Sequence, residues 1–172
     1  MDELDFYKTL YEREFSRRQE LDKLINIPIT IISLIGGILY FLFKNFSFEN
    51  CSFLSFLFTL FIFITFLIII TSTIFIALSF NNLFKGHSYK ELPYPKELKL
   101  YYDKIIEFNK MSEKKQDFNN YLIEKYIDYS DIYMRINDKR SLNLYRAKTA
   151  IIISYFLTFI CIIFYVTKTY IV

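Results

Sequence analysis

The sequence predicts an all-α integral membrane protein with three transmembrane helices, an N-terminal amphipathic helix and a cytoplasmic helical region continuous with the last span. Three observations lead to this fold class. The chain of 172 residues is 53% hydrophobic and 23% charged, and the two classes are segregated along it. Three long runs contain no Asp, Glu, Lys, Arg or His. From residue 117 to the end, no Gly or Pro interrupts a helical pattern.

Residues 1–24 are predicted to form a cytoplasmic amphipathic helix. Charged residues stand between apolar ones at near-helical spacing. We expect it to pack on another cytoplasmic helix, although contact with the lipid surface or a partner stays open. Pro28 removes a backbone donor soon afterwards, so a kink or break is expected where this helix enters the membrane. The apolar positions are Leu4, Tyr7, Tyr11, Phe15, Leu21 and Leu24.

The three apolar runs predict membrane spans, because roughly 20 residues at 1.5 Å each cross the hydrocarbon layer. Residues 25–80 form a hairpin with spans at 25–43 and 53–80, joined by a short loop. The third span covers residues 149–166 and leaves an external tail, 167–172.

The distribution of Lys and Arg predicts the orientation, because basic segments stay on the cytoplasmic side. Residues 1–24 carry five and residues 81–148 carry fourteen, whereas loop 44–52 and the tail carry one each. A multi-pass membrane protein is therefore expected, with a cytoplasmic N-terminus and an external C-terminus.

The second span carries hydroxyls in a row at intervals of seven residues: Thr65, Ser72 and Ser79. Such a hydroxyl commonly bonds a carbonyl of its own helix. The alternative is that the row lines a water-filled pore, and these three residues are the pore-lining candidates.

The cytoplasmic helical region, 81–148, is predicted to continue into the third span as one rod of about fifty residues, roughly 75 Å long. One stripe runs through it: Leu122, Tyr126, Tyr129, Tyr133, Ile136, Arg140, Asn143, Ala147, Ala150, Ser154, Thr158, Cys161 and Tyr165. Within it Ala147, Ala150, Ser154 and Thr158 are small residues suited to close helix packing in lipid.

Four polar residues near the inner membrane face divide into two roles. Arg140 and Asn143 lie on the stripe, where polar groups facing a partner helix can fix register and oligomeric state. We call these two residues the coupling collar. Arg146 and Lys148 are expected to anchor the span against anionic headgroups.

Several function classes are disfavoured by what the sequence lacks. It has no Gly-rich phosphate loop, no metal-ligand cluster and one histidine, His87, so neither catalysis nor a metal or other cofactor is expected. A proton or ion relay needs ionisable groups inside the spans, and the three spans have none, so a secondary transporter is also disfavoured. The charge of +3, with acids interleaved, does not predict direct nucleic-acid binding. Cys51 and Cys161 are not expected to pair.

The strings "YEREFSRRQELDKL", before the first span, and "DIYMRINDKRSLNLYRAK", before the third, give the chain an organisation that resembles small membrane effectors of bacterial anti-phage conflict systems. These are the SLATT and related families found with nucleotide-signalling or CRISPR-type modules. The resemblance implies an oligomeric effector that permeabilises or depolarises the inner membrane, so that the infected cell stops growing. It implies as partners the lipid bilayer, further copies of the chain and a soluble cytoplasmic sensor or effector.

Two other functions remain open. The chain could be a membrane-anchored interaction subunit that docks a soluble enzyme or sensor. It could also be a holin-like lysis protein, which predicts toxicity on expression without any partner.

Overall fold

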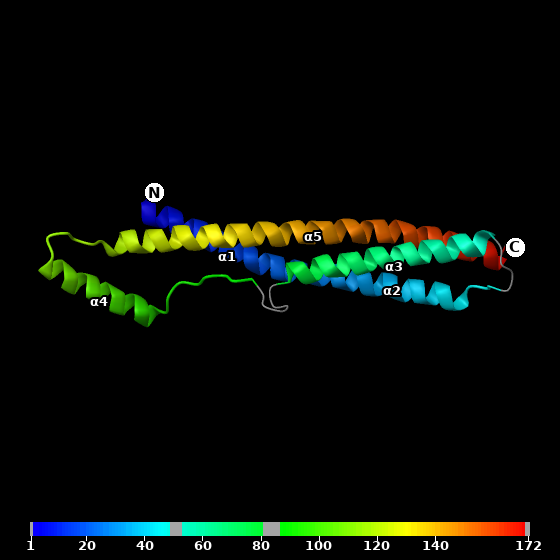
Figure 1. The fold of residues 1–172 in the computed structure, drawn as a ribbon, viewed down its shortest axis with the longest axis horizontal. Coiled ribbons are helices and arrows are strands. Elements are labelled where there is room, and N and C mark those ends of the chain that lie inside the picture. The colour runs from blue at the N-terminus through cyan, green and yellow to red at the C-terminus, as the bar shows by residue number, and fades with distance from the viewer. Residues whose placement is uncertain (1, 49–52, 81–86, 171–172) are drawn as a thin grey trace. The chain divides into compact units, whose positions relative to one another are not determined.

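The protein is all-helical in the part of the chain that the structure, a computed structural model, describes: residues 2–48, 53–80 and 87–170. The predicted fold class is confirmed in this respect, since no strand occurs in that part. Figure 1 labels five helices: α1 (Glu3–Leu24), α2 (Asn26–Asn45), α3 (Phe53–Ser79), α4 (Pro95–Met111) and α5 (Phe118–Tyr170).

The chain divides into two compact units. The first comprises Met1–Leu21 and His87–Asp138, and the second comprises Asp22–Gly86 and Lys139–Val172. The division in α5 falls before the membrane boundary expected at residue 148. The polar segment from 139 to 148 therefore packs with the apolar helices of the second unit.

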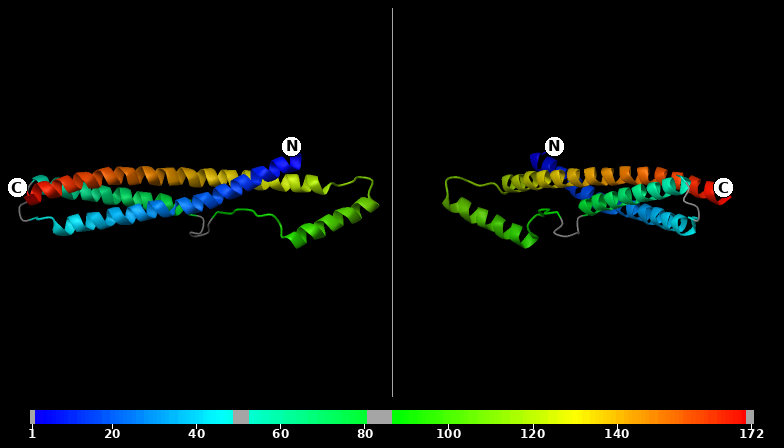
Figure 2. Two further views of the ribbon diagram at one scale, coloured as in Figure 1. Left: turned by 180° about the vertical axis from the view of Figure 1, so that it is seen from behind. Right: turned by 45° about the vertical axis from the view of Figure 1, so that its right-hand side comes forward.

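The second unit consists of α2, α3 and the second half of α5, which run side by side in both Figure 1 and Figure 2. Three helical stretches in the described part of the chain are long and apolar enough to cross a membrane: Glu3–Asn45, Phe53–Ser79 and Phe118–Tyr170. Two core clusters join the helices of this unit. They are Ile35, Leu39, Ile69 and Ile151, and Leu42, Phe46, Phe58 and Cys161.

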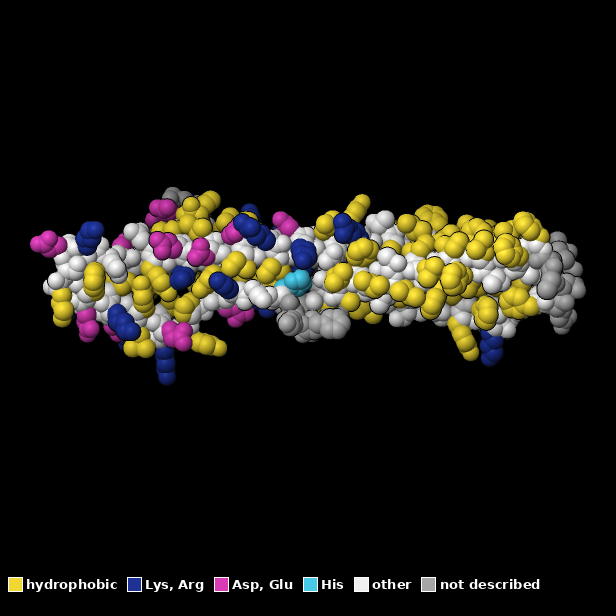
Figure 3. Space-filling model, in the orientation of Figure 1, with side chains coloured by type: hydrophobic (Ala, Val, Ile, Leu, Met, Phe, Trp, Pro, Cys, Tyr) yellow, Lys and Arg dark blue, Asp and Glu magenta, His cyan; other side chains and the backbone are white. Residues whose placement is uncertain are grey.

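The outer faces of the three helices are also apolar. Figure 3 shows hydrophobic side chains over the surface of α2, α3 and the second half of α5. Phe56, Phe63 and Phe156 each leave more than half of their surface exposed. Helices that are hydrophobic on all sides are typical of membrane spans, because lipid covers the outward faces.

The first unit consists of α1, α4 and the first half of α5. Aromatic side chains join these helices: Tyr11 lies 5.6 Å from Tyr126 and 5.5 Å from Tyr133 between ring centroids, and Tyr101 of α4 lies 4.1 Å from Tyr121. The amphipathic helix predicted at the N-terminus thus packs on α5 through its aromatic face.

The break expected near Pro28 is present but small. Only Ile25 separates α1 from α2, and its backbone angles, φ −70° and ψ −28°, are helical. Pro28 is the third residue of α2, so its missing N–H falls in the first turn, where helices lack intrahelical acceptors anyway. The proline therefore lies where its missing N–H removes no hydrogen bond from the interior of α2.

The continuous rod is confirmed, because α5 runs for 53 residues, about 80 Å, without interruption. From Ser130 to Cys161 its buried positions recur at intervals of three and four. A spacing that averages 3.5 residues gives a left-handed coiled-coil seam. The buried residues are Ser130, Tyr133, Asn137, Arg140, Leu144, Ala147, Ile151, Ser154, Thr158 and Cys161, with Asn143 beside them.

Candidate functional site

The most unusual group in the second unit is Arg140, whose side chain is fully buried on α5. Its Nε donates to the Ser79 carbonyl oxygen at 2.8 Å, and one terminal nitrogen forms an ion pair with Asp22. In return the Ser79 hydroxyl donates to the Arg140 carbonyl at 3.0 Å. Residues of three helices, α1, α3 and α5, thus meet at the Arg140 guanidinium.

The coupling collar closes the C-terminal end of α3. The last carbonyls of a helix have no partner within it and carry roughly half a negative charge. Asn143 Nδ2 donates to the Leu78 carbonyl at 3.4 Å, and Arg140 donates to the next carbonyl along. A cation and an amide on α5 therefore supply the cap that Gly commonly provides.

The pore-lining candidates Thr65, Ser72 and Ser79 are all fully buried within the unit. The Ser72 hydroxyl donates to the Ala147 carbonyl at 3.0 Å, and that of Thr65 donates to the Phe61 carbonyl at 2.7 Å. Ser79 and Ser72 are seven residues apart on α3, as are their acceptors on α5, which fits antiparallel helices. In the described state these side chains close the seam between α3 and α5 and line no open channel.

The packing stripe needs one correction. Ala147, Ser154 and Thr158 are buried as expected, but Ala150 is only partly buried and Ile151 takes its place. The helical spacing explains this difference. A step of four residues from Ala147 leads to Ile151, and a further step of three leads to Ser154. The hydroxyls of Ser154 and Thr158 donate to carbonyls one turn earlier in α5, at 3.0 and 2.7 Å, so neither bonds another helix.

The expected headgroup anchors, Arg146 and Lys148, are exposed. The Arg146 guanidinium lies over the Phe75 ring of α3, 5.7 Å from its centroid. This cation–π contact holds the charge beside α3.

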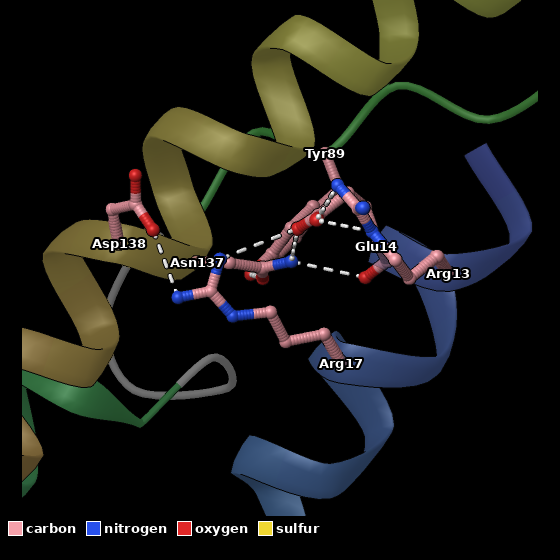
Figure 4. A network of polar contacts seen from close by, with 6 residues as sticks. All are labelled: Arg13, Glu14, Arg17, Tyr89, Asn137 and Asp138. Carbon is pink, nitrogen blue, oxygen red and sulfur yellow. Dashed lines mark hydrogen bonds and ion pairs between the residues drawn. The ribbon is translucent and has the colours of Figure 1, made fainter. Parts of the chain in front are cut away.

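The first unit contains a second buried polar cluster, shown in Figure 4. Asn137 Nδ2 donates to the Glu14 carbonyl at 2.9 Å and to Glu14 Oε2 at 3.2 Å, and Asn137 Oδ1 accepts from the Tyr89 hydroxyl at 2.8 Å. Glu14 and Asn137 are almost completely buried. Arg17 completes the cluster, 3.5 Å from Glu14 Oε2 and 2.8 Å from Asp138.

A third group lies beside this cluster in the same unit. Arg18 donates to the Tyr133 hydroxyl and to Glu91, both at 3.2 Å, and lies over the Tyr89 ring, 4.5 Å from its centroid. Burial, reinforced by the neighbouring Tyr133, raises the pKa of Tyr11 well above its usual range. The aromatic face of α1 is thus held by both stacking and charge.

Sequence reasoning missed Glu14, Asp22 and Asn137, because the N-terminal helix was traced through apolar residues and the stripe on α5 was traced through Ile136 instead of Asn137. A signal was available. Glu14 stands in step with Tyr7, Tyr11, Arg18 and Leu21 at intervals of three and four, and Asn137 stands midway between Tyr133 and Arg140 in the same way.

The described residues offer little for metal chemistry: nowhere in them do three or more His, Cys, Asp or Glu side chains gather closely enough to hold an ion. Cys161 is a buried free thiol, and Cys51 lies outside the described residues. The polar groups of both clusters bond one another and backbone carbonyls, an arrangement suited to fixing helix positions. No protein-family model, curated protein or solved structure matches the chain.

Proposed function

We propose that the chain is an effector of the bacterial inner membrane that permeabilises or depolarises it as a homo-oligomer in anti-phage defence. The observation that carries the proposal is the buried Arg140, which ties the end of α3 to α5 at the boundary between the polar and apolar parts of α5. A charge buried at that point makes the contact between α3 and α5 sensitive to any rearrangement of α5.

The described bundle has the properties of a closed state. Its hydroxyl row on α3 faces α5, and two of its members bond α5 carbonyls directly. If α5 separates from α3, Thr65, Ser72 and Ser79 become available to water as a line of polar groups across the bilayer. A resting chain would then be harmless, as a regulated effector requires.

A homo-oligomer is proposed because three packed spans leave no room for a water path within one chain. Gly36 and Gly37 of α2 support close approach of a second copy, since a Cβ added at either would meet nothing within 4 Å. Small residues on an open face allow helices to pack closely in lipid. The role in antiviral defence, and a soluble cytoplasmic sensor or effector as partner, rest on the resemblance in organisation.

A second candidate function is a membrane-anchored interaction subunit. It is favoured by an apolar groove of about 500 Å³ in the first unit, between α4 and α5, lined by Leu92, Tyr102, Phe118 and Tyr126 among others. In that case the three spans only hold the protein at the membrane, and the closed bundle never opens.

A reversible lock between α3 and α5 tests the first function against the second. Cysteines would replace Ser72 and Ala147 in a chain whose Cys51 and Cys161 are changed to Ala. The Ser72 hydroxyl donates to the Ala147 carbonyl at 3.0 Å, so the two helices are in contact at these positions, and loss of free thiols would establish that the disulfide has formed before flux is measured. Dye and ion flux would be measured in liposomes, with and without extract from phage-infected cells.

With the extract present, the proposal predicts flux through the reduced protein and none through the oxidised protein. Reducing the disulfide should restore the flux. Equal flux in both forms refutes opening between α3 and α5. No flux in any oligomeric state, even with the extract, refutes the effector function and leaves the interaction subunit. Toxicity on expression in the absence of any partner would indicate a holin-like protein instead.

A further inference from the structure

A groove of about 360 Å³ lies on the surface of the second unit between α3 and α5. Its walls are formed by Ile68 and Phe75 from α3 and by Ala150 and Ile153 from α5, and Arg146 stands at one end. Seven residues of helix separate Ile68 from Phe75, so the groove extends for about 10 Å. That is roughly a third of the hydrocarbon thickness of a bilayer.

The two threonines in the groove have their hydroxyls bonded to their own helices. Thr71 donates its hydroxyl to the Leu67 carbonyl at 2.9 Å, and Thr149 donates to the Tyr145 carbonyl at 3.1 Å. With both hydroxyls bonded to their own helices, the walls suit a hydrocarbon chain.

The end of the groove at Arg146 carries a positive charge without an acid nearby. Neither α3 nor the chain from 139 to 172 contains Asp or Glu. Among the residues of this unit that the structure describes, the one acidic residue is Asp22, and it forms an ion pair with Arg140. The ion pairs found among the described residues do not include Arg146, and its guanidinium is held over Phe75 at the groove.

We propose that this groove binds an anionic phospholipid, with the phosphate on Arg146 and part of one acyl chain along Ile68, Ala150 and Ile153. A phospholipid complements the groove, because its acyl chain matches the apolar walls and its phosphate matches the positive charge of Arg146 at the end. A guanidinium binds phosphate through two parallel hydrogen bonds. The inference rests on the proposed insertion of the chain in a membrane, and adds a preferred lipid class at a defined site.

The test is lipid retention by the full-length protein in mild detergent, measured by native mass spectrometry. Phosphatidylglycerol and phosphatidylcholine with identical acyl chains would be titrated, alongside inorganic phosphate. We expect the anionic lipid to be retained about tenfold more tightly, the effect of one charge-assisted contact. Inorganic phosphate should not compete, because it has no acyl chain.

Three variants assign the effect to the groove. Arg146→Gln should reduce retention of phosphatidylglycerol to that of phosphatidylcholine. Lys139→Gln removes an equal charge from an exposed residue outside the groove and should leave the preference intact. Ala150→Leu narrows the groove and should weaken both lipids.

The inference is overturned if the native chain retains both lipids equally, if the two charge variants behave alike, or if inorganic phosphate displaces the lipid. A change of oligomeric mass in Ala150→Leu without a change in lipid retention would assign the groove to a second copy. Alkaline carbonate extraction of cell membranes tests insertion separately. A chain released by carbonate contradicts the proposed function, whereas an inserted chain without lipid preference contradicts this inference alone.

Discussion

Replacing Asp22 by Asn should destabilise the second unit more than replacing Arg140 by Met, although both changes break the same ion pair. The reason is the difference in burial: the Arg140 side chain is 0% exposed, whereas that of Asp22 is 43% exposed. Without Arg140, water can hydrate the carboxylate. Without Asp22, the guanidinium remains buried and loses its counter-charge.

The magnitudes follow from the contacts. Breaking a buried ion pair costs about 3–5 kcal/mol when a charge is left buried. The Ser79 carbonyl and the α3 C-terminus still stabilise the guanidinium by about 1 kcal/mol, so Asp22→Asn should cost about 2–4 kcal/mol. Arg140→Met leaves the Ser79 carbonyl without its hydrogen-bond donor, which costs about 1–3 kcal/mol. Burial of the apolar Met side chain partly offsets this cost.

The double variant Asp22→Asn with Arg140→Met should cost about as much as Arg140→Met alone, because no charge is then left buried. The coupling energy from the double-mutant cycle is therefore expected to equal the cost of Asp22→Asn, about 2–4 kcal/mol. Asp131→Asn is the matched control. Asp131 makes an exposed i,i+4 pair with Arg135 at 2.9 Å, and such pairs contribute about 0.3–0.5 kcal/mol.

The assay uses the buried Cys161 as reporter in a Cys51→Ser chain, since a thiol-reactive dye labels it only on unfolding. A chain of this size shifts its melting midpoint by roughly 2–4 °C per kcal/mol. Asp22→Asn should lower the midpoint by about 9 °C and Arg140→Met by about 4 °C. Equal shifts for the two single variants, or a double variant that equals their sum, would refute the burial argument.

Three further variants are expected to have distinct effects. Asn137→Leu should destabilise the first unit by about 1–3 kcal/mol in chemical denaturation, because it removes the hydrogen bonds of Asn137 with the Tyr89 hydroxyl and the Glu14 carbonyl, while Asp138→Asn on the same helix should stay within about 0.5 kcal/mol. Asn143→Pro should abolish flux yet keep membrane insertion, since proline breaks α5 at a cost of about 3 kcal/mol or more. Asn143→Ala removes only the side chain, so its retained flux would confirm that helix continuity matters. The raised pKa of Tyr11 means that its stabilising effect is complete below pH 10, the usual pKa of a phenol, and is lost above it. Circular dichroism at pH 9 to 11.5 should show this loss in the native chain and not in Tyr11→Phe.

The helices could be predicted from sequence because their signals are local. Hydropathy alone located α3 within one residue of its end at Ser79, and the absence of Gly and Pro gave the full length of α5. Pro28 marked the end of α1. These signals depend on residues that are close in sequence and on whether a segment is apolar enough to be covered by lipid instead of water.

The candidate site could be predicted only in part, because burial of a polar residue depends on partners far along the chain. Arg140 was predicted on the contact stripe and is buried, but its partner Asp22 is 118 residues away and no local pattern indicates it. Periodicity also indicated that Thr65, Ser72 and Ser79 share one face. It could not indicate what that face meets, and α5 covers it.

The position of the buried polar residues on α5 explains why the helix needs no break. A seam with steps of three and four requires each core residue to return to the same side, so a rotation of α5 displaces all of them together. Asn137 and Arg140 are adjacent core positions of this seam, one in each unit. Each has a polar partner on α1, Glu14 for Asn137 and Asp22 for Arg140, and an apolar side chain at either position could not satisfy that partner.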